Sequence, residues 1–193
     1  LNMMSWFIGP DKSRHHVQGI EINPDGTKIF LVFNDVNGNG DGVKEYNLST
    51  PYDIATMSLV TSGGIHLSKG AAGFNPDAIF IGLNGKRLFV TDHDKYTVTQ
   101  YTLHNPYDTS SFTEDGSVSI QDLTSDNNRQ TRALGFSKSG LKMFVSDDEG
   151  DDEIFEFNLA FPFNIIACKC PSITEKKERT GIAEAQIETA KRA

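Results

Sequence analysis

The sequence predicts an all-β protein assembled from three copies of one antiparallel unit, and three observations support this prediction. Apolar residues alternate with polar ones in short runs, which is the pattern of half-buried strands rather than of helices. The same pair of runs, joined by a glycine turn, occurs three times along the 193 residues. A third short run follows each pair and ends in a segment with proline and an aromatic residue.

The first half of each copy predicts two strands joined by a tight turn. The three copies read GIEINPDGTKIFLVFND, AIFIGLNGKRLFVTDHD and ALGFSKSGLKMFVSDDE. Their turn glycines lie 59 and 55 residues apart, at Gly26, Gly85 and Gly140. Glycine supplies the positive φ that such hairpin turns need. Each second strand also places a phenylalanine on the face opposite to its aliphatic residues, at Phe30, Phe89 and Phe144.

The second half of each copy predicts a third strand. It reads VKEYNLSTPYDI (43–54), VTQYTLHNPYDT (98–109) and IFEFNLAFPFNI (154–165), so that the repeat is about 56 residues long. A weaker fourth strand is expected at the start of each copy, at about 4–9, 57–62 and 117–123. Each unit is therefore predicted to contain four antiparallel strands.

Four short antiparallel strands per unit, with no helix between units, are typical of a β-propeller blade. We expect a β-propeller-type array of about three blades over residues 1–168, with repeats of about 4–56, 57–111 and 112–168. One blade alone leaves an apolar face open, so its neighbours must cover it. Propellers close with roughly four to eight blades. The array is thus a partial or open propeller that needs further blades or a second copy, and the start at Leu1 indicates a processed chain or a fragment.

The run PDGTKIFLV, followed by VKEYNLSTPYDI, resembles blades of the lactonase-like or YVTN-like class of β-propellers. Such repeats occur in surface or secreted proteins of marine bacteria and phages. The resemblance covers about 150 residues. It implies blade architecture and an extracellular or cell-surface location. It leaves the activity open, because this architecture carries enzymes, binding modules and scaffolds alike.

The last segment, residues 169–193, predicts a linker and a short C-terminal helix. Ser172 and Glu175 fit a capping box, and Ala183, Ile187 and Ala190 share one helical face. Such a helix can be a solvated linker to a downstream module or a short oligomerising element, and the sequence leaves both open.

Two acidic loops predict calcium binding. Residues 34–42, NDVNGNGDG, match the calcium-loop pattern D-x-[DN]-x-[DN]-G, but Tyr46 stands where a bidentate glutamate closes such a site. Residues 146–153, SDDEGDDE, crowd carboxylates that repel one another unless water or a cation separates them. The candidate metal ligands are Asp35, Asn37, Asn39, Asp41, Asp147, Asp148, Asp151 and Asp152. The alternative is a solvated acidic face without metal.

Charge and composition exclude several classes of partner. The chain carries 18 basic and 26 acidic side chains, net −8, which opposes binding to nucleic acid and to anionic membranes. No apolar run reaches the roughly 18 residues that span a bilayer, so direct membrane insertion is not expected. Cys168 and Cys170 are separated by one residue, too close for an unstrained disulfide and only half of a usual zinc set.

The sequence predicts no catalytic residue. It contains no G-x-S-x-G, phosphate-binding glycine loop or H-E-x-x-H, and its five histidines read as surface or turn residues. We therefore interpret the chain as a non-enzymatic binding or scaffold module of a secreted or surface-displayed protein that contacts a glycan or another protein. The alternative is a metal-dependent lactonase-like hydrolase that lacks its remaining blades.

Overall fold

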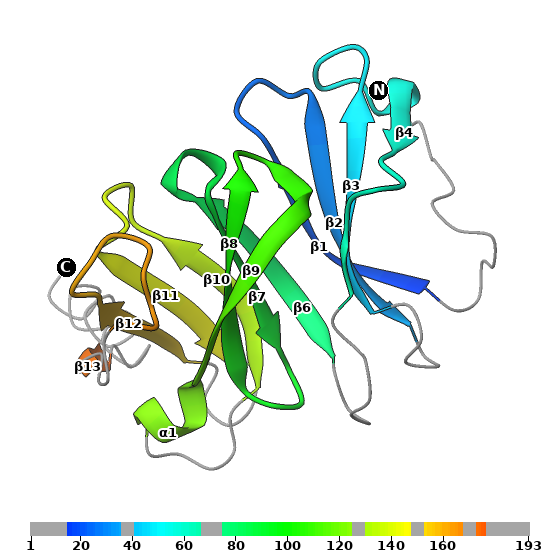
Figure 1. Cartoon of the computed structure of the whole chain (residues 1–193). Helices are drawn as coiled ribbons and strands as arrows, with labels where there is room; N and C mark the ends of the chain where they lie inside the picture. Colours follow the sequence, from blue (N-terminus) through cyan, green and yellow to red (C-terminus); the bar gives the residue numbers. More distant parts are fainter. Residues whose placement is uncertain are drawn as a thin grey trace, which may run out of the picture.

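The computed structural model describes residues 15–35, 41–66, 75–124, 130–147, 153–167 and 173–176. These residues form three antiparallel sheets that follow one another along the chain (Figure 1). The first sheet contains β1 (His15–Ile22), β2 (Lys28–Asp35), β3 (Gly42–Leu48), β4 (Met57–Leu59) and β5 (Ile65–His66). The second contains β6 (Pro76–Gly82), β7 (Arg87–Asp92), β8 (Thr97–Asn105) and β9 (Asp108–Ser119). The third contains β10 (Thr131–Phe136), β11 (Lys142–Asp147), β12 (Ile154–Asn158) and β13 (Ile173–Lys176).

The first four strands of each sheet form a meander in chain order, and in the first sheet β5 pairs with β3 as well. The sheets touch through their first strands. Strand β6 contacts β1 on one side and β10 on the other. The first strands therefore line one side of the array, and the later strands fan outward (Figure 1). This arrangement confirms an all-β, propeller-type array of three blades. We call the sheets blades 1, 2 and 3.

The fourth strand closes each blade rather than opening the next one. β4 pairs with β3, and β9 pairs with β8, so residues 57–59 belong to blade 1 and not to the second repeat as predicted. A short connection lets the chain reach the unpaired edge of the third strand at once, which satisfies that edge's backbone groups. Residues 120–124 form a helical turn, α1 (Ile120–Thr124), where a strand was predicted. The strand predicted at 4–9 lies outside the described residues.

The predicted glycine turns are confirmed, and each is covered by the aromatic residue of the same repeat. The turn glycines adopt positive φ of 71°, 86° and 70° at Gly26, Gly85 and Gly140. The aromatic residues of the proline segment each donate a backbone N–H to the glycine carbonyl at 2.9 Å, from Tyr52, Tyr107 and Phe163. The second half of the repeat thus folds back onto the first hairpin of its own blade.

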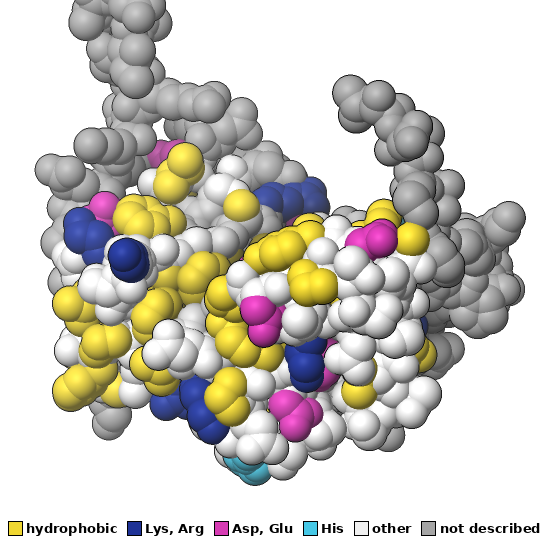
Figure 2. Space-filling view, turned by 90° about the horizontal axis from the view of Figure 1, so that it is seen from above, with side chains coloured by type: hydrophobic (Ala, Val, Ile, Leu, Met, Phe, Trp, Pro, Cys, Tyr) yellow, Lys and Arg dark blue, Asp and Glu magenta, His cyan; other side chains and the backbone are white. Residues whose placement is uncertain are grey.

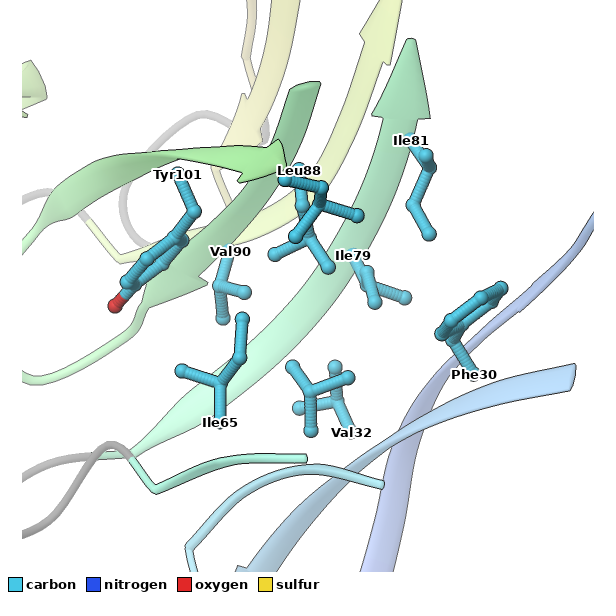
Figure 3. Packing of buried hydrophobic residues seen from close by; sticks show 10 residues of the cluster. Phe30, Val32, Ile65, Ile79, Ile81, Leu88, Val90 and Tyr101 are labelled. Carbon is cyan, nitrogen blue, oxygen red and sulfur yellow. The ribbon is translucent and has the colours of Figure 1, made fainter. Parts of the chain in front are cut away.

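The core lies between the blades. Between blades 1 and 2, Phe30 and Val32 of β2 face Ile79 of β6 and Val90 of β7 (Figure 3). Between blades 2 and 3 the buried cluster contains Phe89, Val98, Met143, Val145, Phe155 and Phe157. The prediction that the phenylalanine of the second strand points away from its aliphatic neighbours is confirmed in blades 1 and 2. Phe30 and Leu31 belong to different clusters, and so do Phe89 and Val90.

The prediction that a C-terminal helix begins near Ser172 is wrong. Residues 173–176 form strand β13, which pairs with β12. The exposed edge of β12 offers backbone hydrogen bonds that outweigh a local capping signal at Ser172 and Glu175. Residues 177–193 and both cysteines lie outside the described residues, and the domain boundary at 168 stays a prediction. In the described part of the chain, no helix is long and apolar enough to cross a membrane.

Candidate functional site

The structure describes only three of the eight predicted calcium ligands. Asn37, Asn39, Asp148, Asp151 and Asp152 lie outside the described residues. The three others lie at strand ends: Asp35 ends β2, Asp41 precedes β3 and Asp147 ends β11. The described residues contain no group of three or more His, Cys, Asp and Glu placed to hold a metal ion. Calcium binding stays a prediction.

Asp41 and Asp147 are buried rather than solvated. An Asp147 carboxylate oxygen accepts the backbone N–H of Gln130 at 3.1 Å. This bond ties the end of β11 to the segment that enters β10. In the described geometry the carboxylate of Asp147 therefore positions the chain within blade 3.

A different polar cluster lies where the first strands begin. Asp77 of β6 is buried, His93 follows β7 directly, and Arg132 lies in β10. Asp77 Oδ2 is 3.2 Å from His93 Nδ1 and 3.0 Å from Arg132 Nη1. The cluster therefore joins two blades through one carboxylate. We call these three residues the rim cluster.

The fold brings the rim cluster together through strand pairing. Asp92 at the end of β7 pairs with Pro76 at the start of β6, and the N–H of His93 donates to the carbonyl of Asn75 at 2.8 Å. Because β6 and β10 are neighbouring first strands, their starting residues meet at the same rim. All three first strands are also irregular here, with register shifts at 17–19, 76–79 and 131–134. Such bulges re-aim side chains and are frequent next to active sites.

Asp92 supports the loop that carries His93. Its side chain is fully buried, and Oδ1 accepts the backbone N–H groups of Asp94 and Lys95 at 3.1 and 3.2 Å. Burial raises the pKa of Asp92, although the backbone hydrogen bonds from Asn75 and Lys95 and the charge of Lys95 act in the opposite direction. The backbone carbonyl of Asp92 accepts the hydroxyl of Thr131 at 3.0 Å. The loop is thereby fixed to both neighbouring first strands.

The rim cluster contains the groups that general-base chemistry needs. A carboxylate next to Nδ1 fixes the histidine ring, which leaves Nε2 as a proton acceptor. Nε2 lies 3.9 Å from a carboxylate oxygen of Asp94, whose side chain is exposed. Arg132, on the other side of Asp77, adds a permanent positive charge that can bind a carboxylate, a phosphate or an oxyanion.

Sequence reasoning missed this cluster because its members come from three segments. It interpreted His93 as a surface or turn histidine, and His93 does lie in the turn after β7, but its side chain is largely buried. One signal was present in the repeat alignment: Asp77 and Arg132 are 55 residues apart, which is the spacing of Gly85 and Gly140. Equivalent positions in neighbouring blades lie on the same rim, so this spacing places the two side chains together.

The opposite ends of the first strands form the other face of the array. Figure 2 shows that face, where hydrophobic side chains gather between the blades. An open hollow of about 400 Å³ lies there between blades 2 and 3, and Phe80, Phe136, Phe163 and Ser139 contribute to its walls. This hollow has both aromatic and polar walls, and it contains neither the histidine nor the arginine of the rim cluster.

Comparison with known proteins identifies the fold but no sequence family. No family model matches the chain, and no curated protein matches it. A solved protein named as a candidate 6-phosphogluconolactonase, from Bacteroides uniformis, is similar with a TM-score of 0.57 and 14% identity, over 89% of this chain and 44% of its own. The periplasmic gluconolactonase of Pseudomonas aeruginosa gives a TM-score of 0.58 and 15% identity, over 85% and 41%.

A non-lactonase propeller is similar as well. The Cps50 β-propeller domain of Myceliophteria thermophila gives a TM-score of 0.52 and 11% identity, over 86% of this chain and 44% of its own. The chain therefore spans less than half of the length of each of these proteins. At such identities the likeness concerns the fold.

The interpretation as a non-enzymatic scaffold is corrected by these comparisons, because enzymes named as lactonases are among the similar structures. Nothing in the comparisons bears on repeat proteins of cell surfaces, and that part of the resemblance stays a prediction. In fold, the chain is a three-bladed array of the β-propeller class and is similar to propellers of the lactonase type.

Proposed function

We propose that this chain supplies the catalytic rim of a lactonase-type hydrolase, which opens a cyclic ester with water. The observation that carries the proposal is the contact of His93 and Arg132 with one carboxylate oxygen of the buried Asp77. The names of the similar lactonases support the reaction class. The chain spans less than half of those proteins, so the proposal concerns the rim that its three blades provide.

In the proposed mechanism, His93 acts first as a base and then as an acid. Asp77 accepts the Nδ1–H of His93, so Nε2 is free to take a proton from a water molecule that attacks the lactone carbonyl carbon. The resulting oxyanion is stabilised by the charge of Arg132. When the ring C–O bond breaks, the imidazolium returns its proton to the leaving alkoxide. The product is an open-chain hydroxy acid, and the enzyme regains its starting protonation state.

Arg132 is held for this role from two directions. Nη1 donates to Asp77, and Nη2 lies 3.4 Å from the side-chain oxygen of Gln130. Its side chain nevertheless remains exposed enough to meet a substrate. Arginine keeps its charge at every accessible pH, so Arg132 gives the site one fixed cation.

The first substrate to test is a sugar lactone, because two of the similar proteins carry names of gluconolactone hydrolases. We expect the protein to hydrolyse δ-gluconolactone faster than the uncatalysed blank, measured by proton release in weak buffer. H93Q should lower kcat about 100-fold or more, because general-base catalysis typically contributes that much. D77N should lower kcat less, because it leaves Nε2 in place but releases the ring.

The matched control is H104Q. His104 lies on β8 of the same blade and is exposed, and its ring nitrogens contact Ser111 and Thr113 rather than the rim. This variant should keep the wild-type rate. A wild-type rate equal to the blank, or equal rates for H93Q and H104Q, would overturn the proposal. Loss of activity with a chelator and recovery with calcium would instead support the metal-dependent form predicted from the sequence.

We also propose that the protein works outside the cytoplasm. The support is the resemblance of its repeats to surface and secreted proteins, together with the periplasmic name of one similar structure. Fractionation of cells that express the parent gene tests this, and recovery in the cytoplasmic fraction alone would contradict it.

A further inference from the structure

Blades 1 and 2 are joined by a buried hydrogen-bonded contact that the repeat encodes. Glu45 of β3 is 1% exposed, and its Oε2 accepts both the backbone N–H and the hydroxyl of Thr109 at 2.8 Å. Thr109 follows the PYD segment of blade 2 and is also 1% exposed. The third strand of one blade thus holds the turn of the next blade.

Blades 2 and 3 repeat this contact with equivalent residues. Gln100 occupies in β8 the position of Glu45 in β3, directly before the aromatic residue of the third strand. Its side-chain oxygen accepts the backbone N–H of Ile165 at 2.9 Å, and both residues are 1% exposed. Ile165 is equivalent to Thr109, because it ends the PFN segment of blade 3. The same acceptor and donor positions therefore join both junctions.

The acceptor half of this contact recurs at the open side of blade 3. The equivalent residue is Glu156 of β12, whose side chain is 32% exposed and contacts Lys142 across the hairpin. Ile154 of the same strand is 59% exposed, whereas the equivalent Val43 and Val98 are 2% and 0% exposed in the two junctions. Blade 3 thus presents the acceptor and an apolar residue that the inner blades bury.

The donor half recurs at the open side of blade 1. The residue equivalent to Thr109 and Ile165 is Ile54, which is 38% exposed. Ile20 of β1 is 59% exposed, whereas its equivalent in blade 2, Ile79, is 6% exposed within the junction. Tyr52, which precedes Ile54 by two residues, is 62% exposed as well. Blade 1 therefore presents the surface that blades 2 and 3 bury against their predecessors.

We propose that the open side of blade 3 binds the open side of blade 1 of a second copy of this chain. Glu156 of one copy accepts the backbone N–H of Ile54 of the other, and Ile154 packs next to Ile20. Two such contacts related by a two-fold axis close a ring of six blades, within the roughly four to eight of closed propellers. The two junctions inside the chain are built from the same repeat positions, so a second copy of this chain offers the complementary surface at both open sides.

The test is the mass in solution, measured by light scattering after size exclusion. The wild-type chain should have twice the 21.3 kDa of one chain. I20D and I154D alter opposite sides of the array, so each should give the mass of one chain. E156Q should keep the dimer, because Gln100 makes the same contact with an amide, and E156A should weaken it about tenfold.

The control is L83D, which places the same charge on blade 2 at a side chain that is also exposed. It should leave the dimer intact, and circular dichroism should show strand content unchanged in all variants. A dimer in which both copies use the same open side would be broken by only one of I20D and I154D. That result, a monomeric wild type, or an assembly larger than two chains would overturn the proposal. Equal dimerisation of E156A and E156Q would remove Glu156 from the contact.

Discussion

The two junctions between blades share one hydrogen bond, from a backbone N–H to a side-chain oxygen, but differ in where the charge lies. At the first junction, Glu45 binds Thr109 and also pairs with Lys28 of the neighbouring strand. At the second, Gln100 binds Ile165 with its oxygen, and its amide nitrogen donates to Asp115 of β9 at 2.8 Å. At the first junction the cation, Lys28, pairs with the acceptor residue Glu45 itself. At the second junction the acceptor residue is neutral, and the carboxylate lies on the outer strand β9, at Asp115.

The basic residue at the second junction pairs with this outer-strand carboxylate. Lys28 is equivalent to Arg87 in the repeat, and Arg87 pairs with Asp115 at 2.8 Å instead of with the residue at the acceptor position. Burial acts to raise the pKa of Asp115, but the hydrogen bonds from Gln100 and Thr102 and the charge of Arg87 hold it below its ordinary value. Both junctions therefore keep a side-chain acceptor at the same repeat position, whereas the carboxylate that pairs with the basic residue lies on β3 in blade 1 and on β9 in blade 2.

The packing around the two acceptors differs in the same sense. Phe80 and Phe163 are stacked near the second junction with ring centroids 6.2 Å apart. The residue equivalent to Phe80 in blade 1 is Glu21, near Tyr107 of the first junction. The first junction thus combines a mainly aliphatic core with a charged hydrogen bond, and the second combines a core richer in aromatic residues with a neutral hydrogen bond.

The largest expected effect is at Glu45. E45A removes the buried acceptor and leaves Lys28 and the Thr109 N–H without it, which should lower the free energy of unfolding by about 3–5 kcal/mol. E45Q keeps an acceptor oxygen, as Gln100 does, and should lose only about 1–2 kcal/mol. Urea denaturation at one fixed protein concentration measures both values. Equal losses for the two variants would show that the acceptor at this junction is not what stabilises it.

A smaller effect is expected from placing the charge of the first junction into the second. Q100E brings a second carboxylate next to Asp115, where Gln100 now donates a hydrogen bond. We expect a loss of about 1–3 kcal/mol near pH 7, because like charges at this distance repel and raise the pKa of the pair. A raised pKa means that the folded state binds protons more tightly, so stability should return as the pH falls toward 4.

The matched control for Q100E is the double variant Q100E/D115N, which removes the second charge. It should recover most of the lost stability at pH 7 and show a flatter dependence on pH. A double variant as unstable as Q100E would attribute the loss to packing around Ile165 instead of to charge.

The smallest expected effect concerns Glu21. Burial raises its pKa to about 7, well above its ordinary value. The folded state therefore keeps the proton at pH 5, and its stability should fall as the pH rises through 7. E21Q removes this dependence and should stabilise the protein at pH 8, because it replaces a partly buried carboxylate with a neutral amide. The gain should be only about 1 kcal/mol, because solvent screens a half-buried charge.

Thermal unfolding at pH 5 and pH 8 measures this difference. E114Q is the control, because it removes the same charge from an exposed position on β9. If E21Q and E114Q change stability equally at both pH values, the environment of Glu21 is not responsible.

Much of the fold follows from local patterns, whereas the candidate site does not. The alternation around Ile20 and Ile22 and the turn at Gly26 predict a hairpin without tertiary information, since both depend on neighbouring residues. The fourth strands were assigned to the wrong repeat, because periodicity identifies a strand but not the edge with which it pairs. His93 and Asp77 meet only after β6 and β7 pair, so no local motif revealed them.

The sequence alone determined the strands, the turn glycines and the three-fold repeat, because these depend on side-chain alternation and on the backbone freedom of single residues. Tertiary structure decided which polar residues of that pattern are buried. Glu45, Gln100 and Glu156 occupy one repeat position and look alike as polar residues between apolar neighbours. The first two are buried because a following blade brings a backbone N–H to them, whereas Glu156 lies at the end of the array.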